Sequence, residues 1–173
     1  MEKCENDNIS ALTCELVDRN YDIDWDRSIE VNDVNECFTS GFFLKCEAYL
    51  KTSGYNTELF IDYVDYDICY KLLEQGEKIS RIEYPGILHE YGNSECRRFL
   101  WKKIIVTNHP CWRKYYMVRN DIWMSIQHPD YVKKVSVYHR ISALILKSII
   151  YEKDKRRSLI FIAKGIIDGK KGR

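Results

Sequence analysis

Apolar residues repeat at every third or fourth position between Asp62 and Gly76. This spacing predicts an amphipathic helix over 62–75. Asp62 has the side chain of a good N-cap, and Gly76 is placed to be the left-handed residue that ends the helix. The same periodicity predicts helices over 112–127 and 131–151, and the second of these has one strongly apolar face.

Other segments have shorter patterns. Residues 37–45 indicate a strand with a tight backbone point at Gly41, and residues 78–84 alternate like a strand. Further expectations cover a short helix ended by Gly54, a turn at Pro85-Gly86, a helix over 95–107, and loops with one or two strands in residues 1–36. Together these elements predict an α/β fold.

Charge is distributed unevenly, although the formal net charge is only +1. Residues 1–40 hold 3 basic and 11 acidic side chains, whereas residues 141–173 hold 9 basic and 3 acidic. The basic, amphipathic C-terminal part is typical of a segment that lies on an anionic membrane surface. We therefore divide the chain into a domain over 1–127 and a helical tail over 128–173. The overall charge gives no indication of nucleic-acid binding.

Seven cysteines are scattered without a C-x-x-C pair, which fits neither a zinc site nor a disulfide framework. Reduced thiols in a cytoplasmic protein are the simplest interpretation. The polar start MEKCENDNIS is not a signal peptide, and the longest apolar run, ISALILKSII, contains a lysine and is too short to cross a bilayer.

Three carboxylates, Asp62, Asp65 and Asp67, fall within the start of the predicted helix. Acidic residues at a helix N-terminus are stabilised by the helix dipole, so the cluster fits a solvated helix start. It fits equally a general base that stays ionised near neutral pH. The residues themselves leave both interpretations open.

Other candidate residues also have two interpretations. His89 is either structural or part of a metal or phosphate site beside Glu90. Arg119 follows aromatic residues and either forms a surface ion pair or clamps a diphosphate. Ser40-Gly41 is either a bulge or a place where a ligand approaches the backbone. The D-x-D spacing in DIDWD, residues 22–26, indicates a loop.

The order TSGFFLKCEAYLKTSGYNTELFIDYVDYDICYKLLEQGEKI, LHEYGN, YYMVRN and AKGIIDGKKGR resembles the C-terminal half of family 2 glycosyltransferases. The likeness is greatest to the bacterial rhamnosyltransferase group, which builds cell-surface polysaccharides, and it runs from Cys37 to the C-terminus. The resemblance implies the acceptor-side half of a GT-A fold followed by amphipathic helices. It also implies inverting sugar transfer, with rhamnose as the expected sugar, from a nucleotide-sugar to a glycan or lipid-linked acceptor.

The resemblance assigns roles residue by residue. It implies Asp65 as the general base, Asp67, Ser40 and Gly41 as acceptor-binding residues, Arg119 as a diphosphate ligand and His89 as a metal ligand. Val64 and Lys71 depart from the family pattern, which usually has Glu and Arg at these places. The enzyme would lie at the inner face of the plasma membrane.

The nucleotide-binding half of such enzymes has no counterpart in this sequence, so we expect a truncated chain. A divalent metal, Mg²⁺ or Mn²⁺, is expected only where that half is supplied. The alternative is an inactive remnant or an interaction subunit that forms a homo-oligomer or pairs with a separate donor half. A metal phosphohydrolase that uses the Asp cluster and His89 is a weaker third hypothesis.

Overall fold

The computed structural model describes residues 9–18, 29–89, 94–99, 102–107 and 109–172. The chain divides into two compact units: Met1–Glu58 with Val64–Glu90, and Leu59–Tyr63 with Tyr91–Arg173. The described residues form a mixed α/β structure with five α-helices, which confirms the predicted class in its coarse form. The boundary predicted after residue 127 falls between two helices of the second unit.

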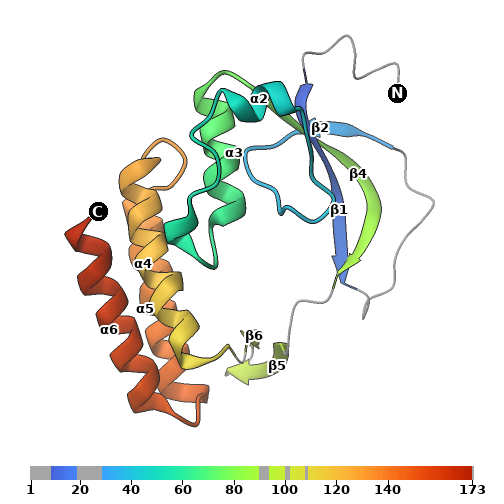
Figure 1. Cartoon of the computed structure of the whole chain (residues 1–173). Coiled ribbons are helices and arrows are strands. Elements are labelled where there is room, and N and C mark those ends of the chain that lie inside the picture. Colours follow the sequence, from blue (N-terminus) through green and yellow to red (C-terminus); the bar gives the residue numbers. More distant parts are fainter. Residues whose placement is uncertain (1–8, 19–28, 90–93, 100–101, 108, 173) are drawn as a thin grey trace. The chain divides into compact units, whose positions relative to one another are not determined.

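A four-stranded mixed sheet in the order β2-β4-β1-β3 forms the centre of the first unit. Strands β1 (Ile9–Asp18) and β4 (Lys78–His89) pair in parallel along their length (Figure 1). The short strands β3 (Phe43–Leu44) and β2 (Val31–Asp33) lie antiparallel to β1 and β4 respectively. The expectation of one or two strands in residues 1–36 is confirmed by β1 and β2.

Strand β4 continues through Pro85 and Gly86, so the turn predicted there is wrong. Cys14 of β1 pairs with Ile82, and the second residue after Cys14 pairs with Ile87. The extra residues of β4 form a bulge, a place where a strand accepts proline because no ladder hydrogen bond is required of it. Pairing with a long parallel neighbour therefore overrides a local turn signal.

Helix α3 (Val64–Glu74) confirms the helix predicted over 62–75. It ends as predicted: Gly76 has φ 74°, its N–H donates to the Leu73 carbonyl at 2.9 Å, and the Glu77 N–H donates to the Leu72 carbonyl at 3.0 Å. This is a Schellman motif. The apolar side of α3 packs on the sheet in a core of buried residues: Ala11, Cys37, Ala48, Ile68, Cys69, Leu72 and Ile79.

Two predictions for the segment before α3 need correction. The strand expected over 37–45 is reduced to the two residues of β3. The short helix exists as α2 (Cys46–Leu50), followed by a 3-10 turn, η1 (Thr57–Leu59), but α2 ends before Gly54. Gly54 instead takes a left-handed conformation, with φ 72°, in the loop between these elements.

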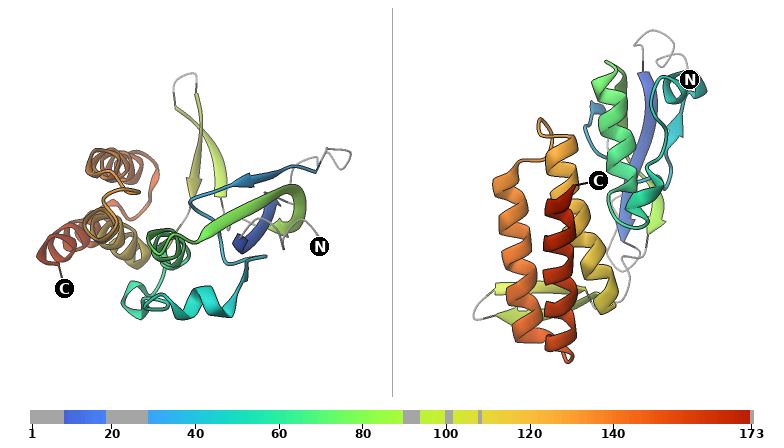
Figure 2. Two further views of the ribbon diagram at one scale, coloured as in Figure 1. Left: turned by 90° about the horizontal axis from the view of Figure 1, so that it is seen from above. Right: turned by 60° about the vertical axis from the view of Figure 1, so that its left-hand side comes forward.

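The second unit contains α4 (Cys111–Gln127), α5 (Lys134–Tyr151) and α6 (Lys155–Lys171), which run alongside one another (Figure 2). The helices predicted over 112–127 and 131–151 are thus confirmed. The helix predicted over 95–107 is wrong, because β5 (Ser94–Phe99) and β6 (Lys102–Thr107) form an antiparallel pair there. A run of β-branched residues in β6 favours the strand.

Helices α4 and α6 approach closely through two glycines. A Cβ added at Gly165 would lie 2.6 Å from the Tyr115 carbonyl oxygen, and one added at Gly169 would lie 3.0 Å from the Ile122 Cβ. The spacing of four residues places both glycines on one face of α6, where the backbones can meet. In the part of the chain that the structure describes, no helix is long and apolar enough to cross a membrane.

Candidate functional site

Asp65 lies in the first turn of α3 and is half-buried. Among the described residues, no hydrogen bond or ion pair engages its carboxylate. Burial raises the pKa of Tyr66 to about 12, and the charges of Glu36 and Asp65 add to that effect. The pKa of Tyr55 is likewise raised, first by burial and then by Asp65. Asp65 is therefore an unengaged carboxylate among protonated phenols.

Asp67 has a structural partner. Its side chain is 0% exposed, and its Oδ2 lies 2.7 Å from the Lys71 Nζ. The same ammonium donates to the Gly54 carbonyl at 2.8 Å, so the pair fixes α3 to the loop that precedes it. Lys71 thus has a defined use although it replaces the expected arginine. Acceptor binding by Asp67 stays a prediction.

The thiols of Cys37 and Cys69 lie 3.5 Å apart in the core of the first unit. Their hydrogen bond raises the pKa of Cys37, with burial adding to the effect, and lowers the pKa of Cys69. The expectation of reduced thiols agrees with the five cysteines whose side chains the structure describes, all of which are free.

Ser40 and Gly41 lie in the turn before β3. Gly41 has φ 70°, and a Cβ there would come within 2.6 Å of the Ile87 Cδ1 and 3.0 Å of the Cys14 sulfur. Close packing of this turn on the sheet therefore accounts for the glycine. Ser40 is half-buried beside it. A role of the two residues in acceptor binding stays a prediction.

His89 is the last residue of β4, and its side chain lies outside the described part of the structure, as do residues 90–93 and the DIDWD segment. No group of three or more His, Cys, Asp or Glu residues in the described ranges is placed to hold a metal ion. Metal binding through His89 stays a prediction.

The segment Leu59–Tyr63 belongs to the second unit and carries three non-glycine residues with positive φ: Phe60 at 61°, Asp62 at 65° and Tyr63 at 68°. Such backbone is costly for residues with a Cβ. The buried Asn120 amide of α4 donates to the carbonyls of Leu59 at 2.9 Å, Ile61 at 2.8 Å and Asp62 at 3.1 Å. One side chain therefore binds three backbone carbonyls of the turn.

The prediction of Asp62 as the N-cap of α3 is wrong. Asp62 lies two residues before the first helical residue, and its carboxylate is bound by Arg113 of α4. Tyr63 extends the same network, because its hydroxyl donates to Asp121 Oδ1 at 2.5 Å, and Arg140 of α5 also binds that carboxylate. Two acid–base pairs thus fix the turn to the helices.

Arg119 is 9% exposed, and its guanidinium lies over the rings of Tyr115, Tyr116 and Trp123, at 5.5, 4.8 and 4.2 Å from their centroids. It donates to Asn120 Oδ1 at 2.9 Å and to the Leu59 carbonyl at 3.3 Å. Arg119 therefore orients the amide that holds the turn. Its binding to a diphosphate stays a prediction.

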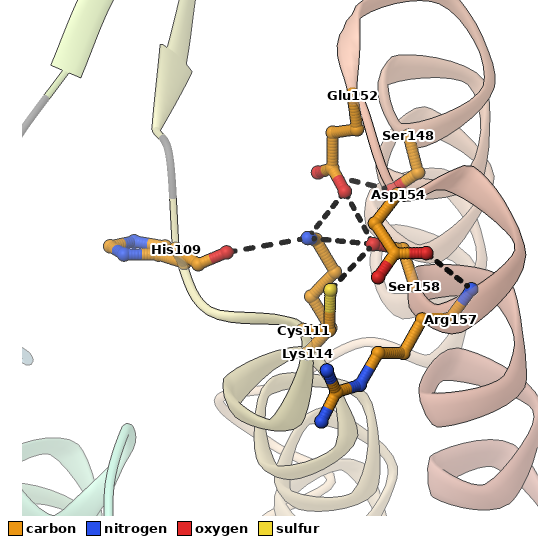
Figure 3. Close-up of polar contacts among 8 residues, drawn as sticks. All are labelled: His109, Cys111, Lys114, Ser148, Glu152, Asp154, Arg157 and Ser158. Carbon is orange, nitrogen blue, oxygen red and sulfur yellow. Dashed lines mark hydrogen bonds and ion pairs between the residues drawn. The ribbon is translucent and has the colours of Figure 1, made fainter.

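A second polar cluster joins all three helices (Figure 3). Lys114 is only 2% exposed. Its ammonium lies 2.6 Å from Glu152 Oε2, and it donates to Ser158 Oγ at 3.2 Å and to the His109 carbonyl at 3.4 Å. Ser158 in turn donates to Glu152 at 2.5 Å. The donors and acceptors satisfy one another, which indicates a structural role.

Sequence reasoning did not select Arg113, Lys114, Asn120 or Asp121. A signal was present: Arg113 and Asn120, like Lys114 and Asp121, are seven residues apart and so share a face of an aromatic-rich helix. Polar residues on a buried helix face need hydrogen-bonding or ionic partners. Such pairs therefore predict long-range polar contacts, but they do not identify the partner residues.

No protein-family model, curated protein or solved structure matches this chain.

Proposed function

We propose that this chain is the acceptor-side part of an inverting, GT-A-type glycosyltransferase of family 2, with Asp65 as the general base. One observation carries the proposal. Of the three clustered carboxylates, Asp62 is bound by Arg113 and Asp67 by Lys71, whereas Asp65 has no hydrogen-bonding or ion-pair partner among the described residues. The sequence resemblance had assigned the base to the same residue.

The position of Asp65 suits that task. The dipole of α3 favours a negative charge in the first turn, and a general base must be ionised and must reach the hydroxyl proton. Asp65 would accept the proton of a sugar hydroxyl as that oxygen attacks the anomeric carbon, with rhamnose the expected sugar. The nucleoside diphosphate would leave from the opposite face, which inverts the configuration.

A divalent metal, where the nucleotide-binding half supplies one, would neutralise the leaving diphosphate. The described residues of this chain do not form a ligand set for it. The proposal includes two further roles: Arg119 would bind the diphosphate, and His89 would bind the metal.

We also propose that α5 and α6 lie on the anionic inner surface of the plasma membrane, where lipid-linked acceptors are found. Val135, Tyr138, Leu146 and Ile149 form an exposed stripe along α5 at helical spacing. The junction of the two helices, KDKRR, is basic and exposed. Apolar surface and positive charge on adjacent helices are the combination that binds such a surface.

The test of the base compares the wild-type chain, Asp65→Asn and Asp130→Asn, an exposed carboxylate of the α4–α5 loop. Each is assayed with a nucleotide-binding half, Mn²⁺, a panel of nucleoside-diphosphate sugars that includes a rhamnose donor, and a lipid-linked acceptor. We expect Asp65→Asn to abolish transfer and Asp130→Asn to keep it. Near-normal turnover by Asp65→Asn would contradict the assignment.

A second candidate is an interaction subunit without chemistry of its own. It is favoured by β2, which forms one edge of the described sheet and exposes all of its three residues. An exposed edge strand can pair with another chain. Calorimetry that detects no binding of nucleotide-sugar and Mn²⁺, together with a dimer in light scattering, would support this candidate over the first.

A further inference from the structure

Three aromatic rings of the second unit form a cluster at the surface. The ring centroids of Phe60 and Tyr116 are 5.0 Å apart, those of Trp112 and Tyr116 6.2 Å, and those of Phe60 and Trp112 6.4 Å. Phe60 is 66% exposed and Trp112 is 43% exposed. Contiguous exposed apolar surface is one mark of a binding site.

The backbone holds this cluster at the surface. Phe60 has φ 61°, a conformation that a bulky residue rarely adopts, and the carbonyls of its neighbours Leu59 and Ile61 are bound by Asn120. The polar network therefore keeps Phe60 in a strained conformation with its ring exposed to solvent. Strained backbone of this type persists only where surrounding contacts over-determine it, and it is concentrated at functional sites.

A polar pair is next to these aromatic residues in the sequence. Arg113 follows Trp112 on α4, and Asp62 is the second residue after Phe60; their side chains are 30% and 21% exposed. The guanidinium uses Nε and Nη2 for Asp62, which leaves its Nη1 as a further donor, and each carboxylate oxygen has a second lone pair. This pair, which has no net charge, thus offers donors and acceptors close to the rings along the chain.

We propose that Phe60, Trp112 and Tyr116 with Asp62 and Arg113, here called the aromatic platform, bind a pyranose ring of a glycan acceptor. The C–H face of the sugar would pack on the rings, and its hydroxyls would bind to the Asp62–Arg113 pair. The pair has no net charge, which disfavours a phosphate, and the desolvation of its two ionic groups disfavours a lipid chain. The inference rests on the proposed function, for which it names the acceptor class.

The test uses this chain and simple sugars. Methyl α-L-rhamnopyranoside, methyl α-D-glucopyranoside and maltoheptaose are titrated, with saturation-transfer NMR and tryptophan fluorescence as readouts. We expect binding in the millimolar range for at least one sugar. Phe60→Ala and Trp112→Ala should each weaken it at least tenfold, and Trp112→Phe should weaken it less. Phe43→Ala, which removes an exposed ring of β3, is the matched control and should leave affinity unchanged.

Because the altered rings are exposed, the melting temperature of each variant should stay close to that of the wild type. If an alanine variant has a clearly lower melting temperature, Trp112→Phe and Trp112→Gln are used in its place. Absence of binding for every sugar, or equal loss in Phe43→Ala, would overturn the platform. The two proposals fail separately. Loss of transfer in Asp65→Asn with an unchanged acceptor KM in Trp112→Ala refutes only the platform. Sugar binding with normal turnover in Asp65→Asn refutes only the base.

Discussion

Arg113 donates two parallel hydrogen bonds to the Asp62 carboxylate, from Nε at 3.1 Å and from Nη2 at 2.7 Å. This bidentate contact joins α4 to the turn that leads into α3, across 51 positions of the chain. A carboxylate that local sequence assigns to a helix cap is therefore used for a long-range contact.

We predict a coupling free energy of about 1 kcal/mol between these two residues, because both are partly exposed and the geometry is bidentate. A double-mutant cycle of Asp62→Asn and Arg113→Lys, followed by urea denaturation, measures it. Arg113→Lys keeps the charge but loses the planar fork. Additive effects of the two substitutions would show that the contact contributes nothing to stability.

Asn120→Ala should lower the free energy of unfolding by about 2 kcal/mol, because buried carbonyls of the 59–63 turn lose their donor. Asn120→Asp should be at least as destabilising, since a carboxylate would face three carbonyl oxygens. Asn32→Ala on the exposed strand β2 is the control and should change stability by less than about 0.5 kcal/mol. Equal stability of Asn120→Asp and wild type would contradict the network.

The sequence was sufficient for elements that local periodicity determines. The spacing of Val64, Ile68 and Leu72 placed α3 correctly, and Gly76 ended it because only a left-handed residue completes the Schellman motif. The long amphipathic helices were predictable for the same reason. These features depend on residues within one or two helical turns.

Long-range pairing explains the failures. Pro85-Gly86 is a strong local turn signal, yet pairing with β1 absorbs it as a bulge. The pairing of β5 with β6 is equally invisible to helical periodicity. In the candidate site, residue type suggested all three carboxylates, and the resemblance assigned the base to Asp65. Only the fold shows that Arg113 binds Asp62 and that Lys71 binds Asp67.

Gly165→Ala should destabilise the chain by about 1–3 kcal/mol, although alanine is the better helix former. The new Cβ would lie 2.6 Å from the Tyr115 carbonyl oxygen, so α4 and α6 would have to separate. Thermal melting by circular dichroism measures the loss. Ala163→Leu, which adds bulk at an exposed position of the same helix, is the control. A stabilised Gly165→Ala would mean that the two helices are not in close contact.

Lys114→Met should lower the free energy of unfolding by about 3 kcal/mol, because it leaves the Glu152 carboxylate without its cation in a mostly buried cluster. The double variant Lys114→Met with Glu152→Leu should recover much of that loss, since no uncompensated charge remains. Chemical denaturation of the wild type, Lys114→Met, Glu152→Leu and the double variant measures both effects. If the double variant is as unstable as the sum of its single changes, the cluster does not act as one unit.

Binding of the chain to anionic vesicles should depend on both the exposed stripe of α5 and the basic residues at the start of α6. Arg156→Gln with Arg157→Gln should weaken binding to mixed phosphatidylserine–phosphatidylcholine vesicles by about 1 kcal/mol per charge, and added salt should have the same direction of effect. Leu146→Gln with Ile149→Gln should weaken binding while leaving the helices folded, because both side chains are exposed. Lys45→Gln, an exposed charge of the first unit, is the control.

Vesicle co-sedimentation and light scattering discriminate between the two partners that an apolar helix face can take, a membrane surface and a second copy of the chain. Unchanged vesicle binding in both double variants would contradict the membrane surface. Loss of a dimer in Leu146→Gln with Ile149→Gln would instead assign the stripe to a second copy of the chain.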